Sequence, residues 1–213
     1  MDQSTAAQFV AFVGTRRVGL GPLPEVALAV RDVIDRGEQH PVLIFDDATG
    51  HVVDVDLRGT REEIVSRLEA AREIGGADES PNGSRDASPD ASPYRDIPVA
   101  RGRGRPKLGV VAREVTLLPR HWDWLASQPG GASAAVRRLV DAARQMNAGA
   151  DRTRQARETA YRFMSAMAGN AADFEEATRA LFAGDMARFT EMTERWPSDV
   201  RDHARRLAAR SFT

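Results

Sequence analysis

The chain has 213 residues, of which 42% are hydrophobic and none is cysteine. This composition supports folded cores and excludes disulfide bonds, thiolate zinc sites and cysteine nucleophiles. The N-terminus lacks the basic and apolar regions of a signal peptide, and no stretch reaches the roughly 18 apolar residues of a membrane span. We therefore expect a soluble, cytoplasmic protein.

The net charge of −1 conceals an uneven distribution of charged residues. Residues 1–100 carry 10 Lys and Arg against 18 Asp and Glu, a net charge of −8. Residues 101–144 carry 9 basic and 3 acidic side chains, a net charge of +6, and residues 145–213 carry 11 and 10. A local basic field attracts polyanions whatever the global charge. The alternative is that the acidic part neutralises the basic segment within the same chain.

The first part of the sequence, residues 1–74, indicates two strand–strand–helix units. In the first unit, the β-rich run 9–13 and the short run 18–20 flank a turn. A helix with a valine-rich face follows. Gly37 stands where this helix should end, because glycine readily adopts the backbone conformation that closes a helix.

The second unit repeats this order. The apolar run 42–45 precedes a turn, and residues 53–57 then alternate apolar and acidic side chains, as a half-buried antiparallel strand does. Thr60 and Glu63 have the spacing of a capping box at the start of a second helix. We therefore expect an acidic ββαββα domain with four strands and with both helices on one face.

Two further regions flank the centre of the chain. Residues 75–100 are mostly Gly, Ser, Asp, Asn and Pro, so they bury too little to offset the entropy of ordering, and we expect a disordered linker. Residues 150–213 carry apolar stripes at helical spacing, with Gly184 and Pro197 as helix boundaries. The sequence thus predicts an α+β protein that ends in an all-helical bundle. We expect the bundle's Met and aromatic residues to form its core, and we predict no cofactor.

Residues 101–112 form a basic arm. Arg101, Arg103, Arg105 and Lys107 place four positive charges in seven residues, interleaved with Gly and Pro. An extended Arg-Gly-Arg-Pro core can lie in the narrow minor groove of A·T-rich DNA, where glycine permits close approach and the guanidinium groups meet an enhanced negative potential. The run resembles an AT-hook. The alternative is a solvated linker.

Residues 113–146 indicate a strand followed by two helices. The β-rich run 113–118 has no partner strand nearby, and pairing with its twin in a second chain would satisfy its backbone groups. The order resembles the ribbon-helix-helix DNA-binding fold, in which a two-stranded ribbon enters the major groove. The resemblance implies a homodimer, with Ser133 capping the second helix beside a bound phosphate. The nucleic-acid contacts that it implies here are Arg113, Gly130, Gly131 and Ser133.

Two features of residues 113–146 depart from that fold. If Leu118 packs inward, the apolar Val115 and Leu117 point at the bases, where they contact little except thymine methyl groups. The first helix is also short for the fold. We therefore expect binding to the DNA backbone rather than sequence-specific readout. The alternative is that the strand joins a sheet or a helix bundle of its own chain.

Six short motifs are spread over nearly the whole chain. They are FDDATG at 45–50, DVDLRG at 54–59, GRPKLG at 104–109, LPRHWDWL at 118–125, FMSAMAG at 163–169 and WP at 196–197. In these motifs the chain resembles an uncharacterised bacterial family, domain of unknown function 2239. The resemblance implies no activity, since none is established for the family.

An acidic hairpin is the strongest candidate for a metal site or for catalysis. Asp46, Asp47, Asp54 and Asp56 gather there and offer oxygen ligands of the kind that Mg²⁺ and Ca²⁺ prefer. Aspartates in a turn and on the solvent side of a strand are common, however, and the four histidines show no paired ligand spacing. No Ser, His and Asp order indicates a nucleophile. We expect neither a metal nor an enzyme.

The sequence therefore favours a dimeric DNA-binding protein or transcriptional regulator. The basic arm would supply affinity for DNA, with A·T-rich DNA as one expected target, and residues 113–146 would form the dimer. Residues 1–74 would bind a ligand or a protein partner. The alternative is a protein–protein interaction module with no role in nucleic-acid binding.

Overall fold

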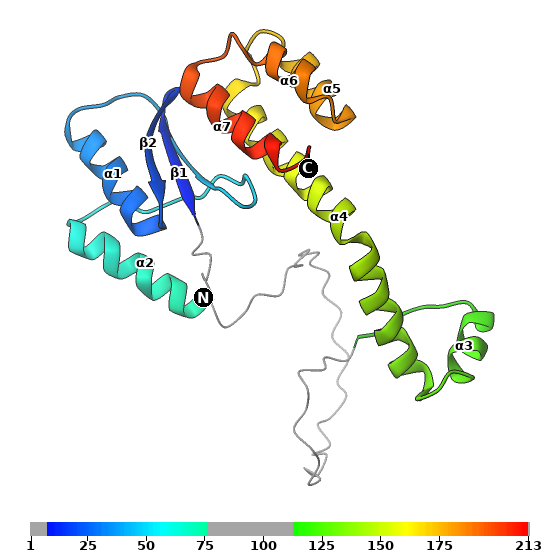
Figure 1. The fold of residues 1–213 in the computed structure, drawn as a ribbon. Coiled ribbons are helices and arrows are strands. Elements are labelled where there is room, and N and C mark those ends of the chain that lie inside the picture. Colours follow the sequence, from blue (N-terminus) through cyan, green and yellow to red (C-terminus); the bar gives the residue numbers. More distant parts are fainter. Residues whose placement is uncertain (1–7, 76–112, 213) are drawn as a thin grey trace, which may run out of the picture. The chain divides into compact units, whose positions relative to one another are not determined.

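The chain forms two compact units in a computed structural model that describes residues 8–75 and 113–212 (Figure 1). Of the described residues, the first unit takes 8–75 and 144–212, and the second takes 113–143. The first unit therefore combines the two ends of the sequence, and the second holds the central segment.

A three-stranded antiparallel sheet forms the middle layer of the first unit. Its strands are β1 (Phe9–Val13), β2 (Arg16–Gly21) and β3 (Val42–Asp46), in the order β2-β1-β3. In the β1–β3 pair, Phe9 lies opposite Asp46 and Val13 opposite Val42. These runs are rich in Val, Ile and Phe, which pack well on a pleated surface. The three strands agree with the first three that the sequence predicts.

The predicted fourth strand does not form in the described chain. Near it, one isolated bridge joins Phe45 to Val52, and residues 53–57 belong to no strand. Arg67 explains part of this, because its guanidinium donates to the carbonyls of residues 56 and 58 at 2.9 and 2.7 Å. A side chain therefore satisfies backbone groups that a strand ladder would have used. The apolar side chains of 53–57 still pack against the core, which accounts for their alternation.

Helix α1 (Leu23–Asp35) covers one face of the sheet. Its Val26 and Val30 pack against Ala11 of β1 and Ile44 of β3. Gly37 follows the helix with φ of +86° and donates its N–H to a carbonyl of the last turn. The predicted helix end is confirmed.

Helix α2 (Arg61–Gly75) packs on α1. The N–H of Glu63 donates to Thr60 Oγ1 at 3.3 Å, and the N–H of Thr60 donates to the Glu63 carboxylate at 2.8 Å. This reciprocal pair confirms the predicted capping box. Ile64, one residue further, is fully buried and fixes α2 to the unit.

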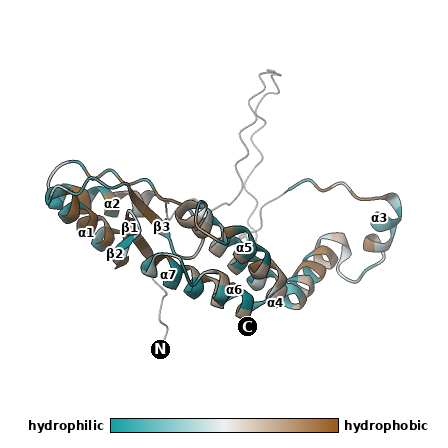
Figure 2. Cartoon of the chain, turned by 90° about the horizontal axis from the view of Figure 1, so that it is seen from above, coloured by the Kyte–Doolittle hydropathy of each residue, from teal (hydrophilic) through white to brown (hydrophobic). Residues whose placement is uncertain are grey.

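The C-terminal helices cover the other face of the same sheet. Phe12 of β1 and Phe45 of β3 share one hydrophobic core with Phe163 and Met164. Figure 2 shows β1 and β3 in the colour of hydrophobic residues. The sequence led us to expect residues 1–74 and 150–213 as separate domains, whereas they share a core. The physical reason is that the FVAFV run of β1 is apolar on both sides, so both faces need a cover.

Four described helices lie beyond residue 130. They are α4 (Gly131–Ala168), α5 (Phe174–Ala183), α6 (Met186–Met192) and α7 (Ser198–Ala209). Gly184, with φ of +78°, ends α5, and Asp185 caps α6 by accepting the N–H of Arg188 at 2.9 Å. Pro197 precedes α7. The boundaries predicted at Gly184 and Pro197 are therefore confirmed.

The second unit contains the predicted strand–helix–helix segment. Residues 113–118 have no regular secondary structure, so the predicted strand does not form within the described part of this chain. Helix α3 (Pro119–Ala126) and the first turns of α4 follow. Leu125 and Ala135 are the buried apolar residues in the described part of this unit. The expected linker at 75–100 and the basic arm at 101–112 lie outside the described residues, apart from residue 75 at the end of α2.

Helix α4 is longer than the sequence predicts. It runs for 38 residues and passes without a break through 146–150, where the central segment was expected to end. Gly149 lies in this stretch, but a single glycine inside a helix costs only about 1 kcal/mol relative to alanine. Its surroundings, rich in Ala and Arg, favour helix. Neither α4 nor any other described helix combines the length and apolar character needed to cross a membrane.

Candidate functional site

The residues predicted to bind nucleic acid fall into two groups. The four of the basic arm lie outside the described residues: Arg101, Arg103, Arg105 and Lys107. The other four lie in the second unit: Arg113, Gly130, Gly131 and Ser133. Arg113 is exposed in the segment before α3, and the remaining three surround the start of α4.

A tight turn joins α3 to α4. Gly130 and Gly131 have φ of +84° and +75°, a region of backbone space that favours glycine. The N–H of Gly131 donates to the carbonyl of Gln128 at 3.0 Å. Because α4 begins at Gly131, Ser133 lies inside the first helical turn, and its predicted role as the cap is wrong. The first turn of α4 carries no acidic side chain, so nothing there neutralises the positive end of the helix dipole.

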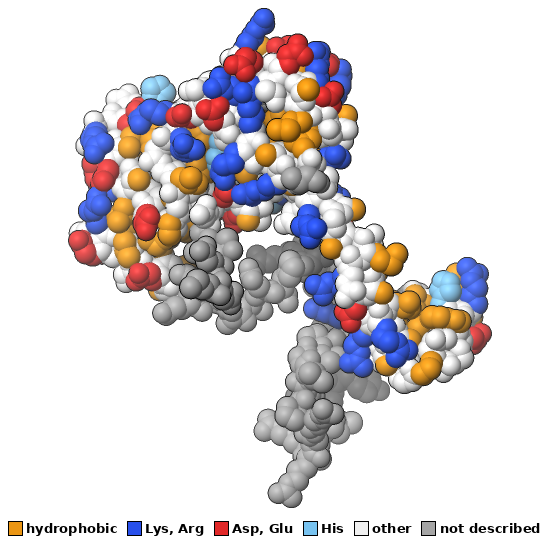
Figure 3. Space-filling view, viewed as in Figure 1, with side chains coloured by type: hydrophobic (Ala, Val, Ile, Leu, Met, Phe, Trp, Pro, Cys, Tyr) orange, Lys and Arg blue, Asp and Glu red, His pale blue; other side chains and the backbone are white. Residues whose placement is uncertain are grey.

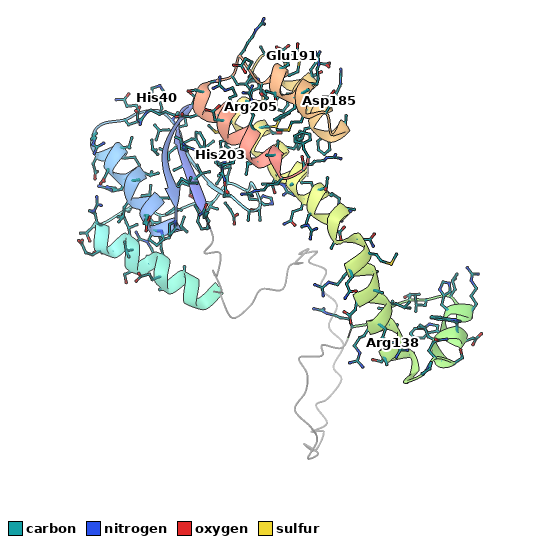
Figure 4. All side chains as sticks on the ribbon, viewed as in Figure 1. His40, Arg138, Asp185, Glu191, His203 and Arg205 are labelled. Carbon is teal, nitrogen blue, oxygen red and sulfur yellow. The ribbon has the colours of Figure 1, made fainter. Side chains whose placement is uncertain are left out.

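Two arginines of α4 bind backbone carbonyls near this turn. Arg138 Nη2 donates to the carbonyl of Pro129 at 3.0 Å, and Arg137 Nε donates to that of Ser133 at 3.3 Å. Figure 4 shows Arg138 on the first part of α4. A carbonyl carries no net charge, so both guanidinium groups keep their full positive charge at the surface.

The two units differ in how their arginines are paired. In the described part of the second unit, four arginines form no ion pair with Asp or Glu: Arg113, Arg120, Arg137 and Arg138. In the first unit most described arginines form one, as in the pairs Arg31–Asp35 and Arg188–Glu191, both at 2.9 Å. A cation with no internal carboxylate can bind an external anion without breaking an existing ion pair. Sequence reasoning did not single out Arg120, Arg137 and Arg138 as contacts.

The second unit also exposes large apolar side chains. Figure 3 shows hydrophobic side chains gathered over α3 and the first part of α4. The exposed members are Val115, Leu118, Trp122, Trp124, Val136, Leu139 and Val140. Trp124 and Leu139 are about half exposed, at 50% and 51%. Apolar patches of this kind mark interaction surfaces more often than scattered apolar residues do.

The acidic hairpin is held by protein groups. Asp46 Oδ1 accepts the N–H groups of Ala48 and Thr49 at 2.7 and 3.0 Å, which fixes the turn. Asp56 pairs with Arg58, and hydrogen bonds from Arg58 hold the pKa of this carboxyl well below its ordinary value. Within residues 8–75 and 113–212 no three His, Cys, Asp or Glu side chains are grouped as metal ligands. The contacts of Asp46 and Asp56 thus stabilise the fold.

Asp47 is buried, with 4% of its surface exposed. Both terminal nitrogens of Arg206 donate to its carboxylate, and Arg210 Nη2 donates to Oδ2 at 3.1 Å. His203 Nε2 lies 3.4 Å from Oδ1. Burial alone would raise the pKa of Asp47, but hydrogen bonds and charge from Arg206 outweigh it, so the pKa is lowered. Asp47 is therefore a buried anion that attaches the turn after β3 to α7.

His203 is neutral at physiological pH. Its ring is 1% exposed and packs against Phe12 and Phe163, with ring centroids 5.6 and 4.5 Å away (Figure 4). Burial, followed by the positive charge of Arg206, lowers the pKa of His203 to about 4. Its Nδ1 lies 3.1 Å from Arg206 Nη2, so this nitrogen accepts and Nε2 carries the proton. The ring therefore orients Arg206.

The same turn is attached to α4. Thr159 Oγ1 donates to the carbonyl of Ala48 at 3.0 Å, and Arg162 Nη1 donates to that of Thr49 at 3.0 Å. Gly50 approaches so closely that a Cβ there would lie 2.4 Å from the Thr159 carbonyl oxygen. The FDDATG motif is thus a docking element. Its partners on α4 and α7 lie more than 100 positions away, and no local sequence signal identifies them.

A groove runs beside this docking element in the first unit. It has a volume of about 820 Å³ and lies between Ala48 of the turn, the stretch of α4 from Gly149 to Thr159, and Ala209 and Arg210 of α7. Its walls combine small side chains with two guanidinium groups. Sequence reasoning placed no site here.

Comparison with known proteins gives one match. The sequence model of a bacterial family, described as an uncharacterized protein conserved in bacteria (DUF2239), matches residues 8–208. No curated protein and no solved structure matches the chain.

Proposed function

Since the chain belongs to the bacterial family DUF2239, whose description names no activity, we propose its function from its own residues: it binds DNA through the basic arm and the second unit. The observation that carries this proposal is that Arg113, Arg120, Arg137 and Arg138 form no ion pair with the described residues. The basic arm directly precedes them in the sequence and adds four further cations.

A polyanion supplies the negative charge with which these arginines are not paired among the described residues. Duplex DNA carries one negative charge per roughly 1.7 Å of its axis, and each phosphate that a cation neutralises releases counterions. Arg101, Arg103, Arg105 and Lys107 alternate with Gly and Pro, which suits an extended arm in the minor groove of A·T-rich DNA. This arm gives affinity and a preference for groove shape, while the second unit binds the backbone.

The turn before α4 supports a phosphate contact. Gly130 and Gly131 carry no side chain that would keep a phosphate from the backbone, and the first helical turn holds no acidic residue. Helix N-termini bind anions through their free N–H groups and their dipole. Arg138 contacts the carbonyl of Pro129 in the same turn, so a cation stands beside these N–H groups. Ser133, inside the first turn, adds a hydroxyl group.

The DNA-binding form is a homodimer. Trp122 and Trp124, both about half exposed, alone present on the order of 200 Å² of apolar surface. This is a sizeable part of the roughly 800 Å² that each partner of a standard interface buries. A second copy would cover this face, and the two segments 113–118 would satisfy each other's backbone groups as in a ribbon. The second units of the two copies then present two sets of arginines to one duplex.

Fluorescence anisotropy with labelled duplexes tests this function. We expect salt-sensitive binding, tighter to A·T-rich than to G·C-rich duplexes, by a species that light scattering identifies as a dimer. Replacing Arg103 and Arg105 with alanine should lower the slope of log K against log salt by about 0.9 for each lost phosphate contact. Replacing Arg179 and Arg188, which form ion pairs in the first unit, is the matched control and should leave the slope unchanged. An unaltered slope in the Arg103 and Arg105 variant contradicts the proposal.

We propose that this DNA-binding dimer acts as a transcriptional regulator in the bacterial cytoplasm, where DNA lies. The first unit, which carries none of the proposed DNA contacts, would then hold the regulatory part. Reporter transcription in a strain with the gene deleted and restored measures this role.

One observation favours a second function, a protein–protein interaction module. The same apolar face over α3 and α4 suits a different protein as well as a second copy. In that case the first unit, with its acidic N-terminal part and its C-terminal helices, also binds partners, and the basic arm acts as a tether. A monomer that ignores both duplexes at low salt would favour this function over DNA binding.

A further inference from the structure

The groove of the first unit combines small apolar walls with positive charge. Ala48, Ala156 and Ala209 supply methyl groups, while Arg152 and Arg210 supply guanidinium groups. The volume of about 820 Å³ falls in the range of about 300–1,000 Å³ that is usual for small-molecule sites. This groove is separate from every residue to which DNA binding was assigned above.

The groove is held open by fixed contacts. Thr159, on its α4 side, donates to the carbonyl of Ala48 on its turn side at 3.0 Å. Arg210, on its α7 side, is oriented by Asp47, to whose carbonyl and carboxylate it donates at 3.2 and 3.1 Å. The protein's own hydrogen bonds therefore hold three separate elements together, so binding here costs little ordering of the protein.

The charge at the groove is positive. None of its described lining residues is Asp or Glu. Arg152 is exposed and forms no ion pair with the described residues, unlike its neighbour Arg154, which pairs with Asp151 at 2.6 Å. His203, behind Asp47, adds no negative charge, because a histidine is either neutral or positive. An anion that enters the groove thus meets Arg152 without a competing carboxylate on the walls.

We propose that this groove binds a small organic anion, a compact apolar body that carries one carboxylate or phosphate group. Arg152 binds the anionic group, and Thr153 and Gln155 offer further hydrogen-bond donors. The alanine walls contact the apolar body. Such a ligand would be the signal that the first unit detects, whatever macromolecule the second unit binds.

Unlike a site that binds any anion, this groove needs both the anionic group and the apolar body of the ligand. Inorganic phosphate offers the charge but no apolar surface, and an aromatic alcohol offers the surface but no charge. A fixed apolar wall adds affinity in proportion to the apolar ligand surface that it covers. Phenyl phosphate and benzoate, which combine the two features, are therefore the appropriate probes.

Isothermal titration calorimetry of the full chain at constant ionic strength tests the proposal. We expect phenyl phosphate or benzoate to bind at least about tenfold more tightly than inorganic phosphate or phenol. Arg152→Ala should weaken binding about tenfold or more, since it removes a charge-assisted hydrogen bond. Arg154→Ala, two residues further along α4, removes an exposed arginine that does not line the groove, and this variant should bind as the wild type does.

A second variant tests the groove itself. Ala209 lines the groove and is exposed, so Ala209→Phe fills the space without disturbing the core, and it should abolish binding while the thermal midpoint of unfolding stays unchanged. The proposal is overturned if no aromatic anion binds at millimolar concentration, if inorganic phosphate binds equally well, or if Arg152→Ala binds as the wild type does. DNA affinity, measured separately, decides the function proposed for the second unit and does not enter this result.

Discussion

Asp47 and Arg206 are 159 positions apart in the sequence and form a buried ion pair in which both terminal nitrogens of the guanidinium donate to the carboxylate. The pair joins the turn after β3 to α7. His203 of α7 and Arg210, the residue that follows α7, lie beside the same carboxylate, so three side chains surround one buried anion. This contact, together with the shared core beneath it, makes the two ends of the sequence a single unit.

Removing the charge of Asp47 should strongly destabilise the first unit. Asp47→Asn leaves Arg206 and Arg210 without their buried carboxylate, and we expect a loss of about 3–5 kcal/mol in the free energy of unfolding. Urea unfolding followed by circular dichroism measures it. Asp54→Asn is the matched control, because Asp54 lies on the same hairpin and is exposed. Equal effects of the two substitutions would contradict the role of Asp47.

The stability of the first unit should fall as the pH falls from about 6.5 to about 4. Burial and the charges of Arg206, Arg17 and Arg210 lower the pKa of His203 to about 4, although Asp47 opposes the shift. The unfolded chain therefore takes up a proton at higher pH than the folded chain does. The contribution is fully present above about pH 6.5, and its loss on acidification is on the order of 3 kcal/mol.

His203→Gln tests the origin of this dependence. Glutamine keeps a hydrogen-bonding side chain near Arg206 but does not titrate, so the slope of unfolding free energy against pH should flatten between pH 4 and 6.5. Asp47, whose pKa is lowered, contributes its own acid dependence below this window. Urea midpoints at half-unit pH steps provide the comparison, and a variant with the wild-type slope would exclude His203 as the source.

Gly50→Ala should destabilise the docking of the turn on α4. Gly50 has φ of +72°, and an added Cβ would lie 2.4 Å from the Thr159 carbonyl oxygen, which belongs to helix backbone and cannot easily move. Gly37→Ala is the control, because Gly37 has a similar φ of +86° but no atom within 4 Å of the added Cβ. We expect Gly37→Ala to cost about 1 kcal/mol from backbone strain alone and Gly50→Ala to cost more. Equal thermal midpoints would exclude the close contact.

Local signals in the sequence predicted the elements well. The capping box of Thr60 and Glu63, the helix ends at Gly37 and Gly184, and the start of α7 after Pro197 all depend on residues within a few positions of each other. Such features are set by backbone geometry and by nearby hydrogen bonds, so the chain order alone is enough to find them.

Features that depend on distant partners could not be found in this way. The strand predicted at 53–57 is replaced by contacts of the Arg67 side chain, and Asp47 has partners more than 150 positions away. One signal did exist for the shared core, because the FVAFV run of β1 is apolar on both faces and needs two covers. For the candidate sites, the sequence predicted contacts in the basic arm and in the segment 113–146, whereas the unpaired state of Arg137 and Arg138 required the structure.

Self-association should depend on the apolar face of the second unit. Leu139 is 51% exposed on α4, and Leu139→Glu places a charge where a second copy would bury it. An unpaired charge at such a contact costs several kcal/mol, so a loss of about 3 kcal/mol raises the dissociation constant of the dimer on the order of 100-fold.

Leu20→Glu is the matched control for this change, because Leu20 is exposed to a similar extent, at 47%, but lies on β2 of the first unit. Light scattering over a concentration series should then show the control as a dimer and Leu139→Glu as a monomer, with equal thermal midpoints for their first units. A dimer that persists in Leu139→Glu would assign self-association to another surface. A wild-type chain that is monomeric at every concentration would instead favour binding of a different protein to this face, because burial of half-exposed tryptophan and leucine side chains is favourable.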